Sequence, residues 1–145
     1  MEVDVRDKQE IAGRIQSRTQ MNENELSHKI IGVAFKLHSV LGPGLLESAY
    51  EVAFYHDLTE EGLNVRRQLP ISFNYNGMKI DSAYKIDLLV NEKVVIELKS
   101  VESLAAIHYA QTLTYIRLAS KKLGLLINFN ETHLKSGIHR IVNNL

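Results

Sequence analysis

The chain of 145 residues contains no cysteine and no tryptophan. The lack of cysteine excludes a disulfide framework, a thiolate zinc site, an iron–sulfur cluster and a cysteine nucleophile. It also suits a reducing compartment, so we expect a cytoplasmic protein. Long hydrophobic runs are absent too, because the stretch from Leu123 to Phe129 is far shorter than the ~20 residues of a membrane-spanning helix. The charged opening segment from Met1 to Glu10 does not resemble a secretory signal, and no membrane association is expected.

An excess of charge of either sign is likewise missing, since 17 Lys and Arg residues balance 17 Asp and Glu residues. Zero net charge argues against a protein that coats nucleic acid non-specifically. The charge is nevertheless uneven, because residues 111–145 hold five basic residues and one acidic residue. This asymmetry fits a positive rim beside an acidic pocket, as a metal-dependent enzyme acting on phosphates would need, but it also fits a chance distribution of solvated charges.

The length and composition indicate one domain. With 45% apolar and 23% charged residues, a chain of this size buries roughly two-thirds of its unfolded surface and forms a single core. Residues 1–20 have few apolar residues among alternating charges, and we expect them to form an N-terminal arm that is disordered or a loosely packed helix. Residues 21–145 form the expected domain.

Hydrophobic periodicity predicts both helices and strands. Helical spacing covers residues 25–41 and 45–61, on either side of Gly42-Pro43-Gly44, and again residues 104–120. Two-residue alternation predicts short strands over 65–68, 71–75, 78–84, 85–90 and 93–99, with a hairpin turn at Asn76-Gly77. Residues 123–129 form a buried strand, and the tail through Val142 adds a last strand or turn. The order predicts an α/β domain with a central mixed β-sheet flanked by helices.

The strands at 85–90 and 93–99 carry the strongest chemical signal. Alternation places Ile86, Leu88 and Val90 on one face and Asp87 on the other. If the connecting turn is centred on Glu92, Asp87 lies directly opposite Glu97, and the two carboxylates need a proton or a divalent cation between them. Mg²⁺ can bind between the two carboxylates and compensate their charge. Lys99 follows on the same face as Glu97, within reach of a water or a phosphate oxygen at the metal. The alternative is that these charges are only the polar side of an amphipathic hairpin.

Two helical segments carry further polar pairs. Gln111 and Tyr115 lie four residues apart on one helix face, with His108 one turn earlier. Glu47 and Tyr50 share a face just after the glycines, although a glutamate in a first turn is also explained by the helix dipole. Other chemistries lack their residues: the six histidines show no zinc pair four residues apart, and neither a Gly-x-Ser-x-Gly elbow nor a phosphate loop is present.

Together these motifs resemble a known family. Gly44-x-x-Glu47-x-x-Tyr50 is similar to the motif of the GxxExxY proteins, and Asp87 with Glu97-x-Lys99, followed by Gln111 and Tyr115, resembles the PD-(D/E)XK nuclease superfamily. The likeness runs from about Glu25 to Val142 and includes residues 124–129 and 137–140. The chain departs from the pattern at Ile86, where the family name has proline, and at Lys85, where arginine is common.

The resemblance implies a restriction-endonuclease-like core and a Mg²⁺- or Mn²⁺-dependent nuclease acting on DNA, less readily on RNA. It implies that Asp87, Glu97 and the Leu98 carbonyl bind the metal, that Glu47 completes the acidic site, and that Lys99 positions or activates the water. Gln111 and Tyr115 would support the site or contact the nucleic acid. The alternative is a weakly active or inactive module with the nuclease fold that binds protein or nucleic acid. The sequence leaves the oligomeric state open, a homodimer included.

Overall fold

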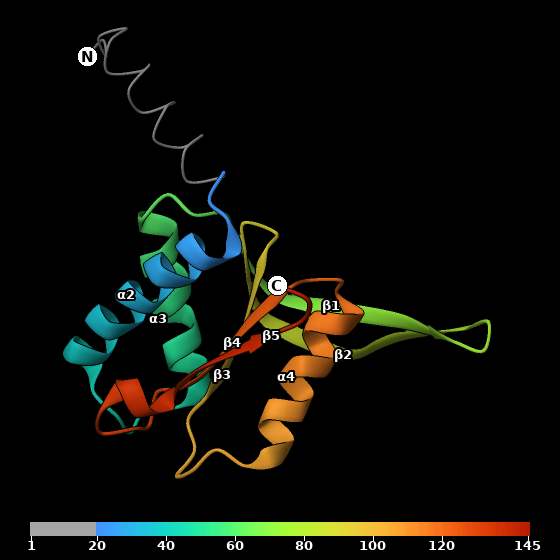
Figure 1. Ribbon diagram of the computed structural model, residues 1–145. Helices are drawn as coiled ribbons and strands as arrows, with labels where there is room; N and C mark the ends of the chain where they lie inside the picture. The colour runs from blue at the N-terminus through green and yellow to red at the C-terminus, as the bar shows by residue number, and fades with distance from the viewer. Residues whose placement is uncertain (1–19) are drawn as a thin grey trace, which may run out of the picture.

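The computed structural model of the protein describes residues 20–145, apart from the side chains of Ser82 and Ala83 (Figure 1). The arm expected over residues 1–20 therefore lies, except for Gln20, outside the described residues. The elements follow in the order α2 (Glu23–Leu41), α3 (Glu47–Glu60), β1 (Val65–Tyr75), β2 (Met78–Val90), β3 (Val94–Lys99), α4 (Ala106–Leu118), β4 (Leu123–Asn128), the 3-10 turn η1 (Leu134–Gly137) and β5 (Ile138–Val142).

The five strands form one mixed sheet in the order β1-β2-β3-β4-β5. The β1–β2, β2–β3 and β4–β5 pairs are antiparallel, whereas β3 and β4 run parallel and are joined through α4. A parallel pair needs such a crossover because the chain must return to the starting end of the sheet. The predicted α/β architecture, a mixed sheet flanked by helices, is confirmed.

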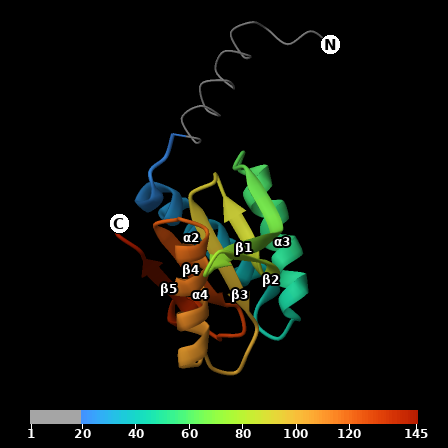
Figure 2. The same ribbon diagram turned by 90° about the vertical axis from the view of Figure 1, so that its right-hand side faces the viewer.

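Helices cover both faces of the sheet (Figure 2). On one face, α2 and α3 enclose a large buried cluster with β2, β3 and β4, in which Tyr50 and Phe54 pack around Phe129. On the other face, α4 packs through Ile116 against a smaller cluster. A Cβ at Gly124 would come within 2.8 Å of the Ile116 side chain, so the glycine lets α4 approach β4 closely. Among residues 20–145, no helix has the length and apolar character needed to cross a bilayer.

Local signals set the helix ends near the predicted positions. The Asn22 side chain accepts a hydrogen bond from the Glu25 N–H at 2.8 Å, and this N-cap starts α2. Gly42, with φ of 66°, ends the same helix, because a left-handed backbone is costly for other residues. Helix α4 is shorter than predicted, since residues 104–105 and 119–120 lie outside it.

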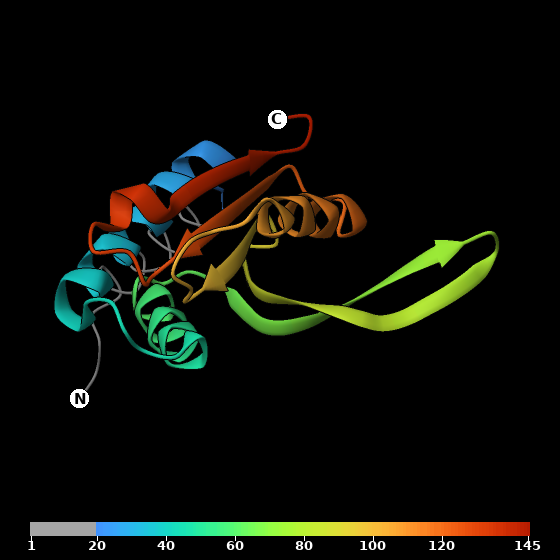
Figure 3. The same cartoon turned by 90° about the horizontal axis from the view of Figure 1, so that it is seen from below.

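Strands β1 and β2 form one long hairpin instead of the four short strands predicted. The turn at Asn76-Gly77 is confirmed, with both residues at positive φ and Tyr75 paired with Met78. The predicted break at Pro70 was wrong because β1 is an edge strand, where a residue without an N–H is tolerated. The far part of this hairpin projects beyond the body of the molecule (Figure 3).

An irregularity in this hairpin overturns the predicted facing of β2. Leu88 and Val90 lie in the large cluster as expected, but Ile86 is buried with Leu89 in the cluster under α4. Gln68 has φ of 50°, and it interrupts the backbone pairing between Arg67↔Leu88 and Leu69↔Ile86. The alternation of side chains therefore changes face at Gln68 and Asp87, which lie opposite each other at the break.

Candidate active site

The candidate site lies where β2 and β3 separate. The two strands pair at Val90↔Val94, Leu89↔Val95 and Leu88↔Ile96, which confirms the register predicted from a turn centred on Glu92. The next pair would be Asp87 with Glu97, and here side chains replace backbone pairing. The Asp87 N–H donates to Glu97 Oε1 at 3.2 Å, and the Leu98 N–H donates to Asp87 Oδ2 at 2.8 Å. The two carboxyl groups are thus fixed beside each other at the fork between the strands.

Burial and neighbouring negative charges raise the pKa values of both carboxyl groups. Glu97 is 4% exposed, and burial together with the charge of Asp87 raises its pKa from 4.5 to about 9. The pKa of Asp87 rises from 3.8 to about 6, mainly through burial, with smaller contributions from Glu51 and Glu47. The hydrogen bond from Leu98 and the charge of Lys99 oppose that rise. Perturbed carboxyl groups of this kind occur at metal and catalytic sites, where a bound cation compensates the charge.

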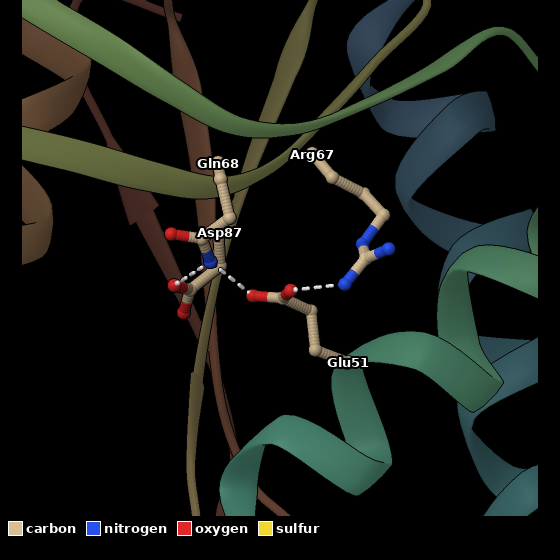
Figure 4. A network of polar contacts seen from close by, with 4 residues as sticks. All are labelled: Glu51, Arg67, Gln68 and Asp87. Atoms are coloured by element: carbon tan, nitrogen blue, oxygen red, sulfur yellow. Dashed lines mark hydrogen bonds and ion pairs between the residues drawn. The ribbon is translucent and has the colours of Figure 1, made fainter.

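Asp87 faces an open cleft of about 620 Å³ between the start of α3 and the hairpin, whose lining does not include Glu97. Its lining consists of Leu46, Glu47, Ser48, Glu51, Gln68 and Asp87. Figure 4 shows how Gln68 connects α3 to the site: its amide nitrogen donates to Glu51 Oε1 at 2.5 Å and contacts Asp87 Oδ1 at 3.4 Å. Arg67 donates to the other oxygen of Glu51 at 3.1 Å. The cleft wall is therefore a continuous polar network ending at Asp87.

Three further residues of the predicted site lie on β3 and α4. Lys99 ends β3 and lowers the pKa of both carboxyl groups, but among the described residues its ammonium forms no ion pair within 4 Å. Burial and the charge of Glu97 raise the pKa of Tyr115, whose ring centroid is 5.5 Å from that of Tyr84. Gln111 is half-buried on the same helix, and its side chain has no hydrogen bond to another described residue of the site.

Glu47 and Tyr50 have different surroundings, contrary to the predicted shared face. Glu47 lines the cleft, whereas Tyr50 is fully buried and stacks on Phe129 at a centroid distance of 4.8 Å. The Tyr50 hydroxyl donates to the Gly42 carbonyl at 2.5 Å and accepts from the Leu45 N–H at 3.2 Å. The residue that shares the cleft with Glu47 is Glu51, because a spacing of four residues aligns better along a helix than a spacing of three.

The chemistry of the donors fits a hard divalent cation. Magnesium is commonly held by one or two carboxylates, with waters and substrate phosphates as further ligands, and Asp87 with Glu97 provides two. In the part of the chain that the structure describes, no three His, Asp or Glu side chains form a metal-binding group. The site contact of Leu98 is made through its N–H, while a role for its carbonyl rests on the resemblance alone. The histidines serve elsewhere: His108, for example, accepts from the Ala105 N–H at the start of α4.

Sequence reasoning missed Glu51, Gln68 and Arg67. Glu51 carried a usable signal, because it follows Glu47 by one helical turn within an acidic first half of the helix. Gln68 and Arg67 carried none, since their place in the cleft depends on the irregular pairing of β1 with β2.

Comparison with known proteins identifies the family. Neither the curated proteins nor the solved structures contain a significant match. The family model of the PD-(D/E)XK nuclease superfamily matches residues 24–141, which include every element except the beginning of α2 and the end of β5. The matched segment contains the fork between β2 and β3 with its two buried carboxyl groups and the following lysine, and the chain belongs to the PD-(D/E)XK nuclease superfamily.

Proposed function

We propose that the protein is a divalent-metal-dependent nuclease that hydrolyses phosphodiester bonds of DNA, less readily those of RNA, with Mg²⁺ or Mn²⁺ held by Asp87 and Glu97. The observation that carries the proposal is the pair of buried carboxyl groups that meet at the fork of the sheet. Burying two neighbouring carboxylates without a cation is unfavourable, and the pKa of Glu97 rises through burial and the charge of Asp87. Membership of a nuclease superfamily supports the same chemistry.

Each site residue has a distinct proposed role. When bound, the cation supplies Lewis-acid stabilisation of the negative charge on the phosphate. Lys99 orients the attacking water and offsets the charge that develops on the phosphate oxygens. Glu47 adds negative charge at the cleft, and Leu98 is the candidate for a carbonyl ligand. Tyr115 and Gln111, on α4, support the site or contact the nucleic acid.

The proposal is tested with purified wild-type chain, labelled DNA and either Mg²⁺ or Mn²⁺. Wild-type protein should cleave, whereas Asp87→Ala, Glu97→Ala and Lys99→Ala should each lose cleavage while keeping a cooperative thermal transition. Lys36→Ala, on the exposed side of α2, is the matched lysine control. Lys93→Ala would not serve, because the Lys93 side chain contacts the Met21 carbonyl. A variant that cleaves as well as the wild type removes that residue from the mechanism.

One observation favours a second candidate, a module with the nuclease fold that binds without cleaving. The described residues contain no group of three metal-ligating side chains, and one oxygen of each key carboxyl group already accepts a backbone hydrogen bond. Calorimetric titration with Mg²⁺ and Mn²⁺ separates the two candidates. Heat of binding that disappears in Asp87→Asn supports the nuclease, whereas no binding at millimolar metal, together with intact DNA after incubation, supports the binding module.

A further inference from the structure

The long β1–β2 hairpin has a part that the fold does not use. The last side chains of β1 and β2 buried in the small cluster are Ile71 and Ile86, against α4. Beyond them, and beyond Tyr84, whose ring contacts Tyr115 of α4, residues 72–83 extend away from the body as two strands alone, which we call the arm (Figure 3). A two-stranded hairpin is at best marginally stable in water. Because the arm adds little to the core, its length calls for a contact outside the chain.

The two faces of the arm differ in character. Cross-strand partners share a face, and the pairs Phe73↔Ile80 and Tyr75↔Met78 put apolar side chains on one face of the arm, beyond a register shift between Ile71 and Phe73. At the tip, Tyr75 and Met78 are 59% and 58% exposed. The other face of the arm has the polar and basic pair Asn74↔Lys79, and Lys85, paired with Pro70, lies on the body side of the register shift.

Charge complementarity identifies the occupant. The basic residues available to a ligand on the hairpin are Lys79, in the arm, and Lys85, at its base, because Arg66 and Arg67 are paired with Glu92 and Glu51. Lys85 forms no ion pair within 4 Å among the described residues, and Lys79 lies 3.4 Å from Asp81 with both side chains 66% exposed. Two lysines on one strand of a projecting ribbon suit contact with the phosphates of a nucleic acid, while an exposed aromatic side chain at the tip suits contact with bases.

The dimensions agree with this partner. From Asp87 to Met78, β2 advances by roughly 30 Å at about 3.3 Å per residue. One turn of B-DNA is about 34 Å long. A duplex with its scissile phosphate at Asp87 can therefore extend along β2, past Lys85 and Lys79, for nearly one helical turn and reach Tyr75 and Met78.

We propose that the arm, together with Lys85 at its base, is a DNA-binding ribbon, which holds the duplex outside the catalytic cleft through the phosphate contacts of Lys79 and Lys85 and the base contacts of Tyr75 and Met78. This inference rests on the proposed function for its substrate. It assigns the arm to binding and not to hydrolysis, so its experiments measure affinity in EDTA, where metal-dependent cleavage cannot occur.

The first experiment measures fluorescence anisotropy of a labelled duplex of about 20 base pairs, long enough to span the cleft and the arm. Lys79→Ala should weaken binding roughly threefold to tenfold and reduce the slope of log affinity against log salt by about one, as loss of one phosphate contact requires. Lys135→Ala is the matched control, because η1 lies at the opposite end of the molecule from the arm (Figure 3). If Lys79→Ala and Lys135→Ala bound the duplex with equal affinities and equal salt slopes, the proposal would be overturned.

The second experiment replaces the apolar tip. Tyr75→Ser with Met78→Ser should weaken binding about tenfold with an unchanged salt slope, since apolar contact with the bases of a duplex neutralises no phosphate and releases no counterion. Val40→Ser, at an 81% exposed position of α2, is the control for removing surface hydrophobicity. Circular dichroism melts check that all variants fold, and the exposure of the replaced residues makes loss of folding unexpected. An unchanged affinity would overturn the base contacts. They would also be overturned if sedimentation velocity showed that the wild type is a dimer and the tip variant a monomer.

The outcomes separate this inference from the proposed function. Arm-dependent binding without cleavage by any metal-loaded protein would retain the arm and reject the nuclease. Cleavage with arm-independent binding would reject the arm and retain the nuclease. Comparison with a single strand of the same sequence tests the partner, and preference for the single strand would overturn the fit to a duplex.

Discussion

The backbone N–H of Asp87 donates to the side chain of Glu97, at the position where an antiparallel ladder would pair it with a carbonyl. The exchange is reciprocal across the fork, because the Asp87 carboxyl group accepts from the N–H of Leu98. The fold thus uses its two key carboxyl groups to satisfy the backbone of separating strands. Each carboxyl group keeps a second oxygen for other contacts.

The first prediction concerns stability in the absence of metal. The folded state holds a proton on Glu97 up to a pKa of about 9, while the unfolded chain releases it near 4.5. This contribution to stability is complete below pH 4.5 and is lost as the pH rises towards 9. Asp87 adds a smaller loss between its ordinary pKa of 3.8 and about 6. In EDTA, Tm should therefore fall by several degrees between pH 6 and pH 9.

The Glu97→Gln variant isolates that contribution. Glutamine cannot ionise and keeps an oxygen for the Asp87 N–H, so the variant should match the wild type near pH 5 and exceed its Tm at pH 9. Differential scanning calorimetry of both proteins across this range provides the measurement. Parallel curves of Tm against pH would contradict a protonated Glu97.

Metal binding should reverse the same trend. A cation bound by Asp87 and Glu97 displaces their protons, so Mg²⁺ affinity should rise between about pH 6 and pH 9 and binding should release protons. Titrations in buffers of different ionisation enthalpy measure that release directly. Asp87→Asn should bind Mg²⁺ at least a hundredfold more weakly. Affinity that does not change with pH would place the cation elsewhere.

Much of the fold was predictable because its signals are local. The turn at Asn76-Gly77 and the end of α2 at Gly42 both depend on residues that accept positive φ, which a sequence displays directly. The register that sets Asp87 beside Glu97 followed from the turn at Glu92 and the strict two-residue period of strands.

The remainder depended on tertiary placement. Tyr50 and Glu51 are adjacent in the sequence, yet Tyr50 lies in the core and Glu51 lines the cleft. The position of Phe129 places Tyr50 in the core, and the position of the hairpin places Glu51 at the cleft. The change of face at Ile86 followed from the break at Gln68, a residue type that gives no sign of a positive φ. The length of β2 was missed because Tyr84 and Lys85 look like the ends of two strands when the partner strand is unknown.

The two glutamates of the α3 cleft wall should tune the site without being indispensable. Glu47 and Glu51 both raise the pKa of Asp87, so their charges act on a carboxyl group of the proposed cation site. Glu47→Gln and Glu51→Gln should each lower Mg²⁺ affinity by about threefold to tenfold, because each removes one nearby negative charge. The control is Glu60→Gln, exposed at the far end of the same helix. If calorimetric titration gave either variant the same Mg²⁺ affinity as Glu60→Gln, that residue would be excluded from the site.

The hydroxyl of Tyr50 should stabilise the loop that positions Glu47. It donates to the Gly42 carbonyl and accepts from the Leu45 N–H, while the Leu45 carbonyl accepts from Ser100 Oγ at 2.6 Å. Tyr50→Phe keeps the stacking on Phe129 but leaves two backbone groups without their partner, so the free energy of unfolding should fall by about 1–2 kcal/mol. Urea unfolding against Tyr75→Phe, altered at an exposed position, measures the difference. Because Ser100 follows Lys99 directly, a loosened loop should also lower the cleavage rate. A stable variant with normal cleavage would show that the hydroxyl does not hold the loop.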